Sequence, residues 1–160
     1  MAKRLKDSIP ARRHVMNRYD EAMQAMAERF GHETLISLAT VDGNRPFVRT
    51  VNGYYENGAF YVITWAYSNK MKHIAVNPEV AVFHTDEWFT AHGVGENLGH
   101  VQDERNEAIM LNVREAFASW YGKDHFDVND PNTCLLRIRL TDGALLYTEY
   151  KQIDFVRQTA

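Results

Sequence analysis

The sequence predicts a mainly β (α+β) fold, in which about six or seven strands form an antiparallel barrel with helices packed outside. Short apolar runs recur along the chain and are separated by turn residues such as Asp42-Gly43-Asn44 and Asn57-Gly58. Long stretches with the three- and four-residue apolar spacing of amphipathic helices occur near each end. Because tight turns join most of the strands, a repeated βαβ plan and a doubly wound nucleotide fold are disfavoured.

The elements follow from apolar spacing and from the residues that stop each run. We expect helices at residues 11–30, 69–76 and 103–120. We expect strands at residues 33–41, 46–55, 59–65, 79–84, 88–101, 134–140 and 144–150. Ser68 is the predicted N-cap of the short helix and Asn77-Pro78 its stop, while Thr141-Asp142-Gly143 is predicted to turn the last two strands into a hairpin. The residues after 150 are expected to form a short tail.

Composition limits the classes of function. A chain of 160 residues is the size of one domain, and we treat residues 1–160 as a single domain. The formal net charge of −3 argues against nucleic acid or membranes as partners, so any anion site must be local. Cys134 is the only cysteine, which excludes an intramolecular disulfide and fits a reducing cytoplasm. The basic N-terminal stretch is not followed by an apolar run, so we expect a cytoplasmic protein.

The segment from Thr64 to Val80 carries the most specific chemistry. If Ser68 caps a helix, the free amide groups of the first turn attract anions. Lys70 and Lys72 lie in or near that turn, where their charges oppose the helix dipole unless an anion binds. Arg49, on a strand that the Asn57-Gly58 hairpin sets nearby, supplies a guanidinium. These groups together predict a phosphate site.

These residues resemble a known family. The string T-x-x-x-S-x-K-x-x-x-I-x-x-N-P-x-V at residues 64–80, preceded by R-x-V at 49–51, is similar to the flavin-binding region of the pyridoxamine 5'-phosphate oxidase-like split-barrel family. The resemblance extends more weakly over residues 33–155 and implies FMN as cofactor. It implies a homodimer with the flavin sites at the subunit interface. The FMN-binding residues that it implies are Arg49, Thr50, Val51, Thr64, Ser68, Asn69, Lys70 and, from the partner subunit, Trp88.

The chain departs from the biosynthetic oxidases of that family at three places. Asn69 stands where these oxidases have an arginine, and Asn52-Gly53 stands where they have a basic residue. Residues 150–160 lack their C-terminal arginine and histidine motif. Oxidation of pyridoxamine phosphate is therefore not expected.

The seven histidines raise a metal or haem alternative, with His84, His92 and His100 as candidates on adjacent strands. Their spacing matches no metal-ligand signature, so no metal site is expected. Haem remains an alternative to FMN, because one histidine suffices for haem and some split-barrel relatives bind it.

Two functions remain open at this stage. The first is an FMN-dependent oxidoreductase acting on an unidentified small molecule or electron donor. It needs no catalytic side chain, because the flavin carries the hydride chemistry. The second is a non-catalytic protein that stores or senses FMN or haem.

Overall fold

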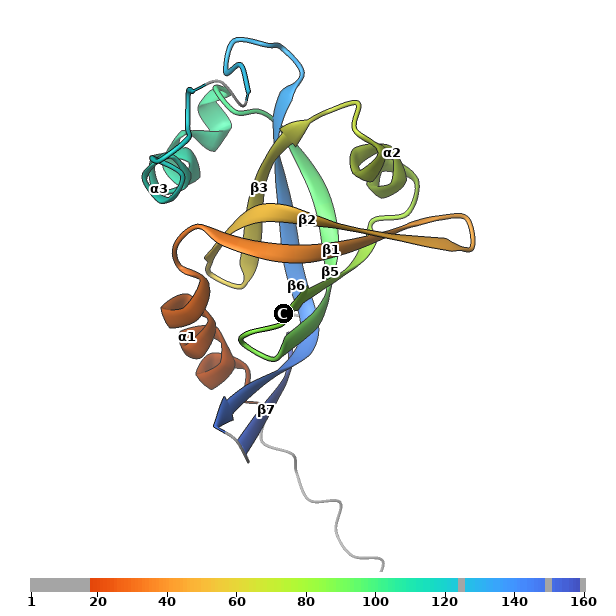
Figure 1. Ribbon diagram of the computed structural model, residues 1–160, viewed down its shortest axis with the longest axis vertical. Coiled ribbons are helices and arrows are strands. Elements are labelled where there is room, and N and C mark those ends of the chain that lie inside the picture. Colours follow the sequence, from red (N-terminus) through yellow and green to blue (C-terminus); the bar gives the residue numbers. More distant parts are fainter. Residues whose placement is uncertain (1–17, 124–125, 149–150, 159–160) are drawn as a thin grey trace, which may run out of the picture.

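The computed structural model describes residues 18–123, 126–148 and 151–158 (Figure 1). It is an antiparallel six-stranded closed barrel with one additional strand and three α-helices, which confirms the predicted fold class. The strands are β1 (Thr34–Asp42), β2 (Arg45–Glu56), β3 (Ala59–Trp65), β4 (Glu79–His84), β5 (Phe89–His100), β6 (Thr133–Thr148) and β7 (Lys151–Val156). They lie in the order β3-β2-β1-β4-β5-β6-β7, and pairing of β3 with β6 closes the barrel.

Short turns that contain glycine and asparagine connect the first three strands of the barrel. Gly43 (φ +57°) lies in the two-residue turn between β1 and β2, and Asn57-Gly58 (φ +48° and +81°) joins β2 to β3. All three positive φ values occur at glycine or asparagine, the residues that such turns favour. The β1–β2 hairpin is long, and its tip projects past the barrel beside α2 (Figure 1).

The helices are α1 (Tyr19–Phe30), α2 (Asn69–Val76) and α3 (Glu107–Ala116), the last preceded by the single 3₁₀ turn η1 (Glu104–Asn106). In α1, Ala22, Met26 and Phe30 point into the barrel core, where the Phe30 ring meets those of Phe60 and Phe89. A smaller apolar cluster lies under α3. Helices α2 and α3 stand at the same end of the barrel, on either side of β3 (Figure 1).

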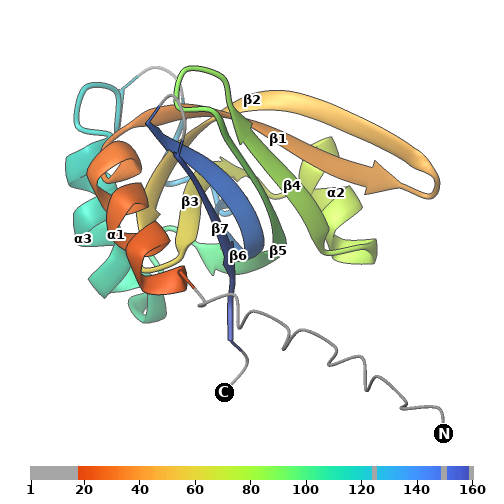
Figure 2. The ribbon, with the colours of Figure 1, turned by 90° about the horizontal axis from the view of Figure 1, so that it is seen from below.

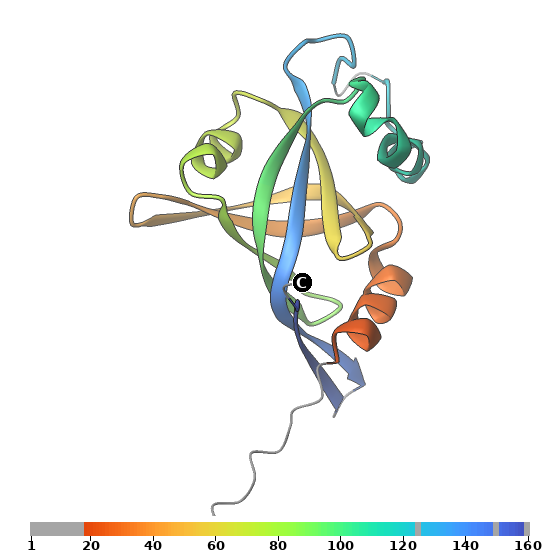
Figure 3. The ribbon, with the colours of Figure 1, turned by 180° about the vertical axis from the view of Figure 1, so that it is seen from behind.

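The predicted hairpin at residues 141–143 is wrong. Strand β6 runs through this segment, side by side with β5 along the back of the barrel (Figure 3), and the true hairpin is β6–β7, formed by part of the expected tail. A register shift against His92 and Gly93 absorbs the extra residue as a bulge. Gly143 allows β5 and β6 to approach closely, because a Cβ at this position would lie 2.5 Å from the carbonyl oxygen of Thr90.

Two helix boundaries also differ from the prediction. The expected helix at 103–120 is an α-helix only over Glu107–Ala116, and residues 117–122 continue as tight turns such as Trp120 N–H to Phe117 O. The N-terminal helix begins at Tyr19, and residues 11–17 of the prediction lie outside the described residues. Among the helices described, none has the length and apolar character needed to cross a membrane.

Candidate functional site

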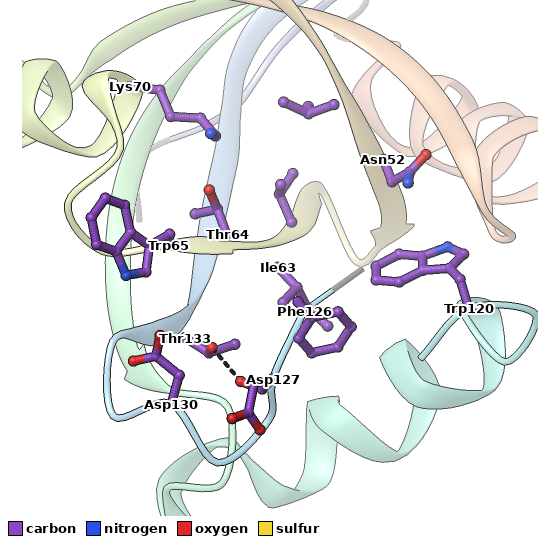
Figure 4. Close-up of a pocket in the computed structure, with 12 residues that line it drawn as sticks. Asn52, Ile63, Thr64, Trp65, Lys70, Trp120, Phe126, Asp127, Asp130 and Thr133 are labelled. Atoms are coloured by element: carbon purple, nitrogen blue, oxygen red, sulfur yellow. Dashed lines mark hydrogen bonds between the residues drawn. The ribbon is translucent and has the colours of Figure 1, made fainter. Parts of the chain in front are cut away.

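The first turn of α2 presents Ser68 and Lys70 to one end of a pocket. Ser68 is the N-cap, as predicted, but its hydroxyl makes no capping hydrogen bond to the helix backbone. Lys70 Nζ instead lies 3.4 Å from Ser68 Oγ, and the lysine side chain points into the pocket (Figure 4). Burial, and then the charge of Arg49, hold the pKa of Lys70 below its usual value.

Arg49 reaches the same region from β2. Its Nη1 donates to Thr40 Oγ1 at 2.6 Å, and to the carbonyl oxygens of Leu38 and Phe47 at 3.3 and 3.4 Å. Burial lowers the pKa of the guanidinium, which remains charged because free arginine titrates far above neutral pH. Neutral oxygen atoms therefore hold Arg49 in place.

Neither Arg49 nor Lys70 forms an ion pair with a carboxylate in the described part of the chain. Both are partly buried, and the effect of Arg49 on the pKa of Lys70 shows that the two charges repel. Two neighbouring cations without an acidic partner disfavour each other's charged form, and a bound anion would relieve this repulsion. This end of the pocket is therefore suited to a phosphate group.

The pocket itself has a volume of about 640 Å³, which is ample for a flat cofactor-sized molecule. Figure 4 shows how strands and loops surround it. Its lining residues are Val51, Asn52, Val62, Ile63, Thr64, Trp65, Lys70, Trp120, Phe126, Asp127, Asp130 and Thr133. Lys70 and Thr64 lie at one end, while the rings of Trp120 and Phe126, edge to face at 5.4 Å, form a wall at the other.

The structure brings together five of the residues predicted from sequence. Val51, Thr64 and Lys70 line the pocket, Ser68 contacts Lys70, and Arg49 is close enough to perturb Lys70. Cys134, buried and opposite Thr64 in the β3–β6 ladder, has a pKa raised to about 11 by burial, which fits a packing residue.

Three predicted residues lie elsewhere in this chain. Thr50 is exposed on the outer face of β2, and Asn69 lines a separate hollow on the far side of α2. Trp88 is 72% exposed in the β4–β5 turn. The six residues of β4, about 20 Å of extended chain, separate that turn from α2. Within one subunit, Trp88 is not part of this site.

The family model described as pyridoxamine 5'-phosphate oxidase matches residues 22–147, which is most of the chain. The chain belongs to this family. The match includes the barrel, α2 and every residue lining the pocket. A search of curated proteins gave no significant match.

Solved structures share the family fold at low sequence identity. A NimC/NimA family protein from Clostridium acetobutylicum aligns with a TM-score of 0.65 and 22% identity, over 87% of this chain and 94% of its own. A FAD-binding protein from Mesorhizobium loti aligns with a TM-score of 0.56 and 16% identity, over 75% of this chain and 90% of its own. A heme binding protein from Mycobacterium smegmatis aligns with a TM-score of 0.62 and 14% identity, over 85% of this chain and 57% of its own. These likenesses show the split-barrel fold of the pyridoxamine 5'-phosphate oxidase family.

Sequence reasoning missed several residues of the site. Thr40 contacts Arg49 directly, and His73 contacts Thr40. Neither residue belongs to a sequence motif, and they meet only because β1 packs against α2. Trp120 is the last residue of the helix expected at 103–120, yet it lines the pocket. Phe126, Asp127 and Asp130 lie between the expected helix at 103–120 and the expected strand at 134–140, where no motif marks them.

The three candidate histidines do not gather. His84 Nδ1 accepts from Glu87 N–H, His92 lies 2.8 Å from Asp142, and His100 Nε2 lies 3.0 Å from the Asp130 carbonyl oxygen. No group of three histidine, cysteine or acidic side chains suited to a metal occurs among the residues described.

Proposed function

We propose that this member of the pyridoxamine 5'-phosphate oxidase family binds FMN and works as an FMN-dependent oxidoreductase on a small molecule. The observation that carries the proposal is a partly buried cation, Lys70, at one end of the 640 Å³ pocket, with a second partly buried cation, Arg49, near enough to lower its pKa and with no carboxylate partner for either among the described residues. FMN joins a phosphate dianion to a flat ring system, and the pocket offers cations at one end and aromatic walls at the other.

Each residue has a distinct part in this proposal. Arg49, Lys70 and the hydroxyl of Ser68, which Lys70 Nζ contacts at 3.4 Å, would bind the phosphate. Thr64 and the backbone at Val51 would hold the ring, and Trp120 with Phe126 would exclude water from the pocket. When bound, the flavin supplies hydride transfer, so the protein contributes position and a dry site.

A homodimer is part of the same proposal. None of the helices that the structure describes covers the outer face of β1, β2 and β4 (Figure 2). Cross-strand neighbours on this face are small or apolar, with Ser37 between Thr50 and Phe83, and Ala39 between Val48 and Ala81. A sheet face that carries these small or apolar side chains is suited to a second copy of the chain. Such a dimer would also give exposed Trp88 a place against the partner's flavin.

The heme binding neighbour keeps haem as the second candidate ligand. Against it, the pocket lining that the structure describes contains no histidine to serve as an axial ligand. The absorption spectrum of the purified protein distinguishes the two ligands, because the flavin absorption bands differ from the Soret band of haem.

The decisive experiment compares FMN with riboflavin, which lacks the phosphate. We expect Lys70→Ala and Arg49→Ala each to weaken FMN binding about ten- to a hundredfold, the value of one charge-assisted hydrogen bond. Riboflavin binding should change little. Lys72→Ala is the matched control, since Lys72 is exposed on the same helix and lies outside the pocket. Equal losses for both ligands would contradict the phosphate site.

Turnover is tested separately on the FMN-loaded protein. Reduction by a nicotinamide donor followed by reoxidation with an added acceptor supports an enzyme. A flavin that stays oxidised with every donor supports a binding protein that stores or senses FMN.

A further inference from the structure

A buried threonine joins the two elements that carry the phosphate-binding cations. Thr40, on β1, has no exposed surface. Its Oγ1 lies 2.6 Å from Arg49 Nη1 on β2 and 2.8 Å from His73 Nδ1 on α2. His73 is three residues after Lys70, so the two side chains are neighbours on the helix.

The hydrogen bonds that link Arg49, Thr40 and His73 have a defined direction. A guanidinium can only donate, so Thr40 Oγ1 accepts from Arg49. The threonine hydroxyl hydrogen is then available to His73 Nδ1, which accepts it when the imidazole is neutral and carries its proton on Nε2. Every polar group of the buried hydroxyl is satisfied, which is the condition for a stable buried network.

Phe47 completes the arrangement from the β1–β2 hairpin. Its carbonyl oxygen accepts from Arg49 Nη1 at 3.4 Å, and its ring packs against the His73 imidazole with centroids 4.9 Å apart. Arg49 pairs with Leu38 in the ladder, so Thr40 is its diagonal neighbour on the same face of the sheet. The guanidinium is therefore held from several sides before any ligand arrives.

We infer that Thr40 and His73 are positioning residues that set the preference of the site for a phosphorylated ligand. The inference rests on the proposed FMN site and extends it to residues that do not line the pocket. An arginine side chain is flexible, and ordering it during binding weakens affinity. The Thr40–His73 pair orders Arg49 in advance, and it ties β1 to α2 so that Arg49 and Lys70 keep their relative placement.

Variants of Thr40 and His73 test this through the ratio of FMN to riboflavin affinity. Thr40→Val keeps the shape of the side chain and removes the hydroxyl. We expect it to weaken FMN about tenfold, within the range for one hydrogen bond to a charged group, and to leave riboflavin unchanged. Thr40→Ser should restore FMN affinity. His73→Phe keeps the ring contact with Phe47 but removes the acceptor. Its loss of FMN affinity should be smaller than that of Thr40→Val.

The double variant Thr40→Val/His73→Phe adds a test of coupling. Because His73 acts through Thr40, the double variant should bind FMN no more weakly than Thr40→Val alone. Independent roles would instead multiply the two losses, and this result would overturn the proposed chain of contacts.

Thr34 provides a matched control. It is a buried threonine on the same strand, and its hydroxyl contacts the His32 carbonyl oxygen and ring nitrogen at 3.2 and 3.4 Å, near the other end of β1. Thr34→Val should leave the FMN-to-riboflavin ratio at its wild-type value. The same change in ratio for Thr34→Val and Thr40→Val, or no change for a folded Thr40→Val, would overturn the inference.

A second measurement keeps the inference separate from the proposed function. If wild-type protein binds no flavin, the flavin proposal fails, and inorganic phosphate is titrated while NMR follows the Arg49 side-chain N–H signal. Weaker phosphate binding by Thr40→Val then supports the inference. Equal phosphate binding by both proteins, or none by wild type, overturns it. If Thr40→Val does not fold, His73→Phe, on a partly exposed helix position, gives the same comparison.

Discussion

The indole Nε1 of Trp120 donates a 2.6 Å hydrogen bond to Oε1 of Glu33, 87 residues earlier in the chain. Ser119 Oγ approaches the other carboxylate oxygen at 3.3 Å, and the Trp120 ring stacks on Phe117 with centroids 4.7 Å apart. Glu33 directly precedes β1, so these contacts fix the segment after α3 against the barrel. They set where the aromatic wall of the pocket stands.

Removing this anchor should loosen the wall without touching the phosphate end. We expect Glu33→Ala to lower the free energy of unfolding by about 1 kcal/mol, a reduced value because the carboxylate is partly exposed. FMN and riboflavin affinities should fall by the same factor, and Trp120 emission should shift to longer wavelength. Ser119→Ala, which removes only the longer contact, should have little effect. A selective loss of FMN would contradict this division of the pocket.

The two unpaired cations predict an unusual dependence of stability on pH. The pKa of Lys70 in the folded protein lies below 10.5, so the unfolded chain binds more protons as pH approaches 10.5 from below. Stability should therefore rise with pH across that window. Urea unfolding over an alkaline pH series should show this rise in wild type and a flatter curve in Lys70→Met. Saturating phosphate should reduce the rise, and identical curves for both proteins would contradict the assignment.

Gly143 distinguishes a strand from a turn at residues 141–143. Asparagine tolerates positive φ, so it would be accepted in a turn but not where a Cβ meets Thr90 O at 2.5 Å and Ala91 Cβ at 2.7 Å. We expect Gly143→Asn to destabilise the protein by about 1–3 kcal/mol or more in urea unfolding. Gly43→Asn, in a real turn with φ +57° and open space around it, should be nearly neutral. Equal effects would contradict a continuous β6.

The proposed dimer face predicts a monomeric variant. Val48 is 71% exposed on the outer face of β2 and would be buried by a partner on that face. Val48→Glu should raise the dimer dissociation constant at least about a hundredfold, because an unpaired charge is costly to bury. Val156→Glu changes another exposed valine, 62% exposed on β7, and should leave the dimer intact. Sedimentation measures both, and a wild-type monomer that binds flavin fully would contradict an interfacial site.

Much of the fold was predictable because its causes are local. Asn57-Gly58 determines a tight hairpin by its own backbone preferences, and Ser68 with Asn77-Pro78 limits α2 to the predicted residues. The T-x-x-x-S-x-K string likewise predicted that Thr64, Ser68 and Lys70 lie together, since α2 and the end of β3 are adjacent in the chain.

The errors arise where distant segments decide the local structure. Thr141-Asp142-Gly143 has turn chemistry, but ladders with β5 and β7 satisfy its backbone on both sides and keep it extended. The helix predicted to reach Trp120 ends near Ala116, and Trp120 instead bonds to Glu33. Local propensity yields in both cases to pairing and burial that depend on tertiary structure.

By itself, the sequence determined the barrel class, the position of α2 and the presence of cations suited to a phosphate. Only the tertiary structure decided which groups surround those cations. It showed that Arg49 and Lys70 lack a carboxylate partner among the described residues, that Thr40 and His73 hold Arg49, and that Trp88 lies away from the site within one chain. The physical reason is that spacing along a chain sets hydrogen bonds within an element, whereas burial and charge pairing depend on elements that meet only when the barrel closes.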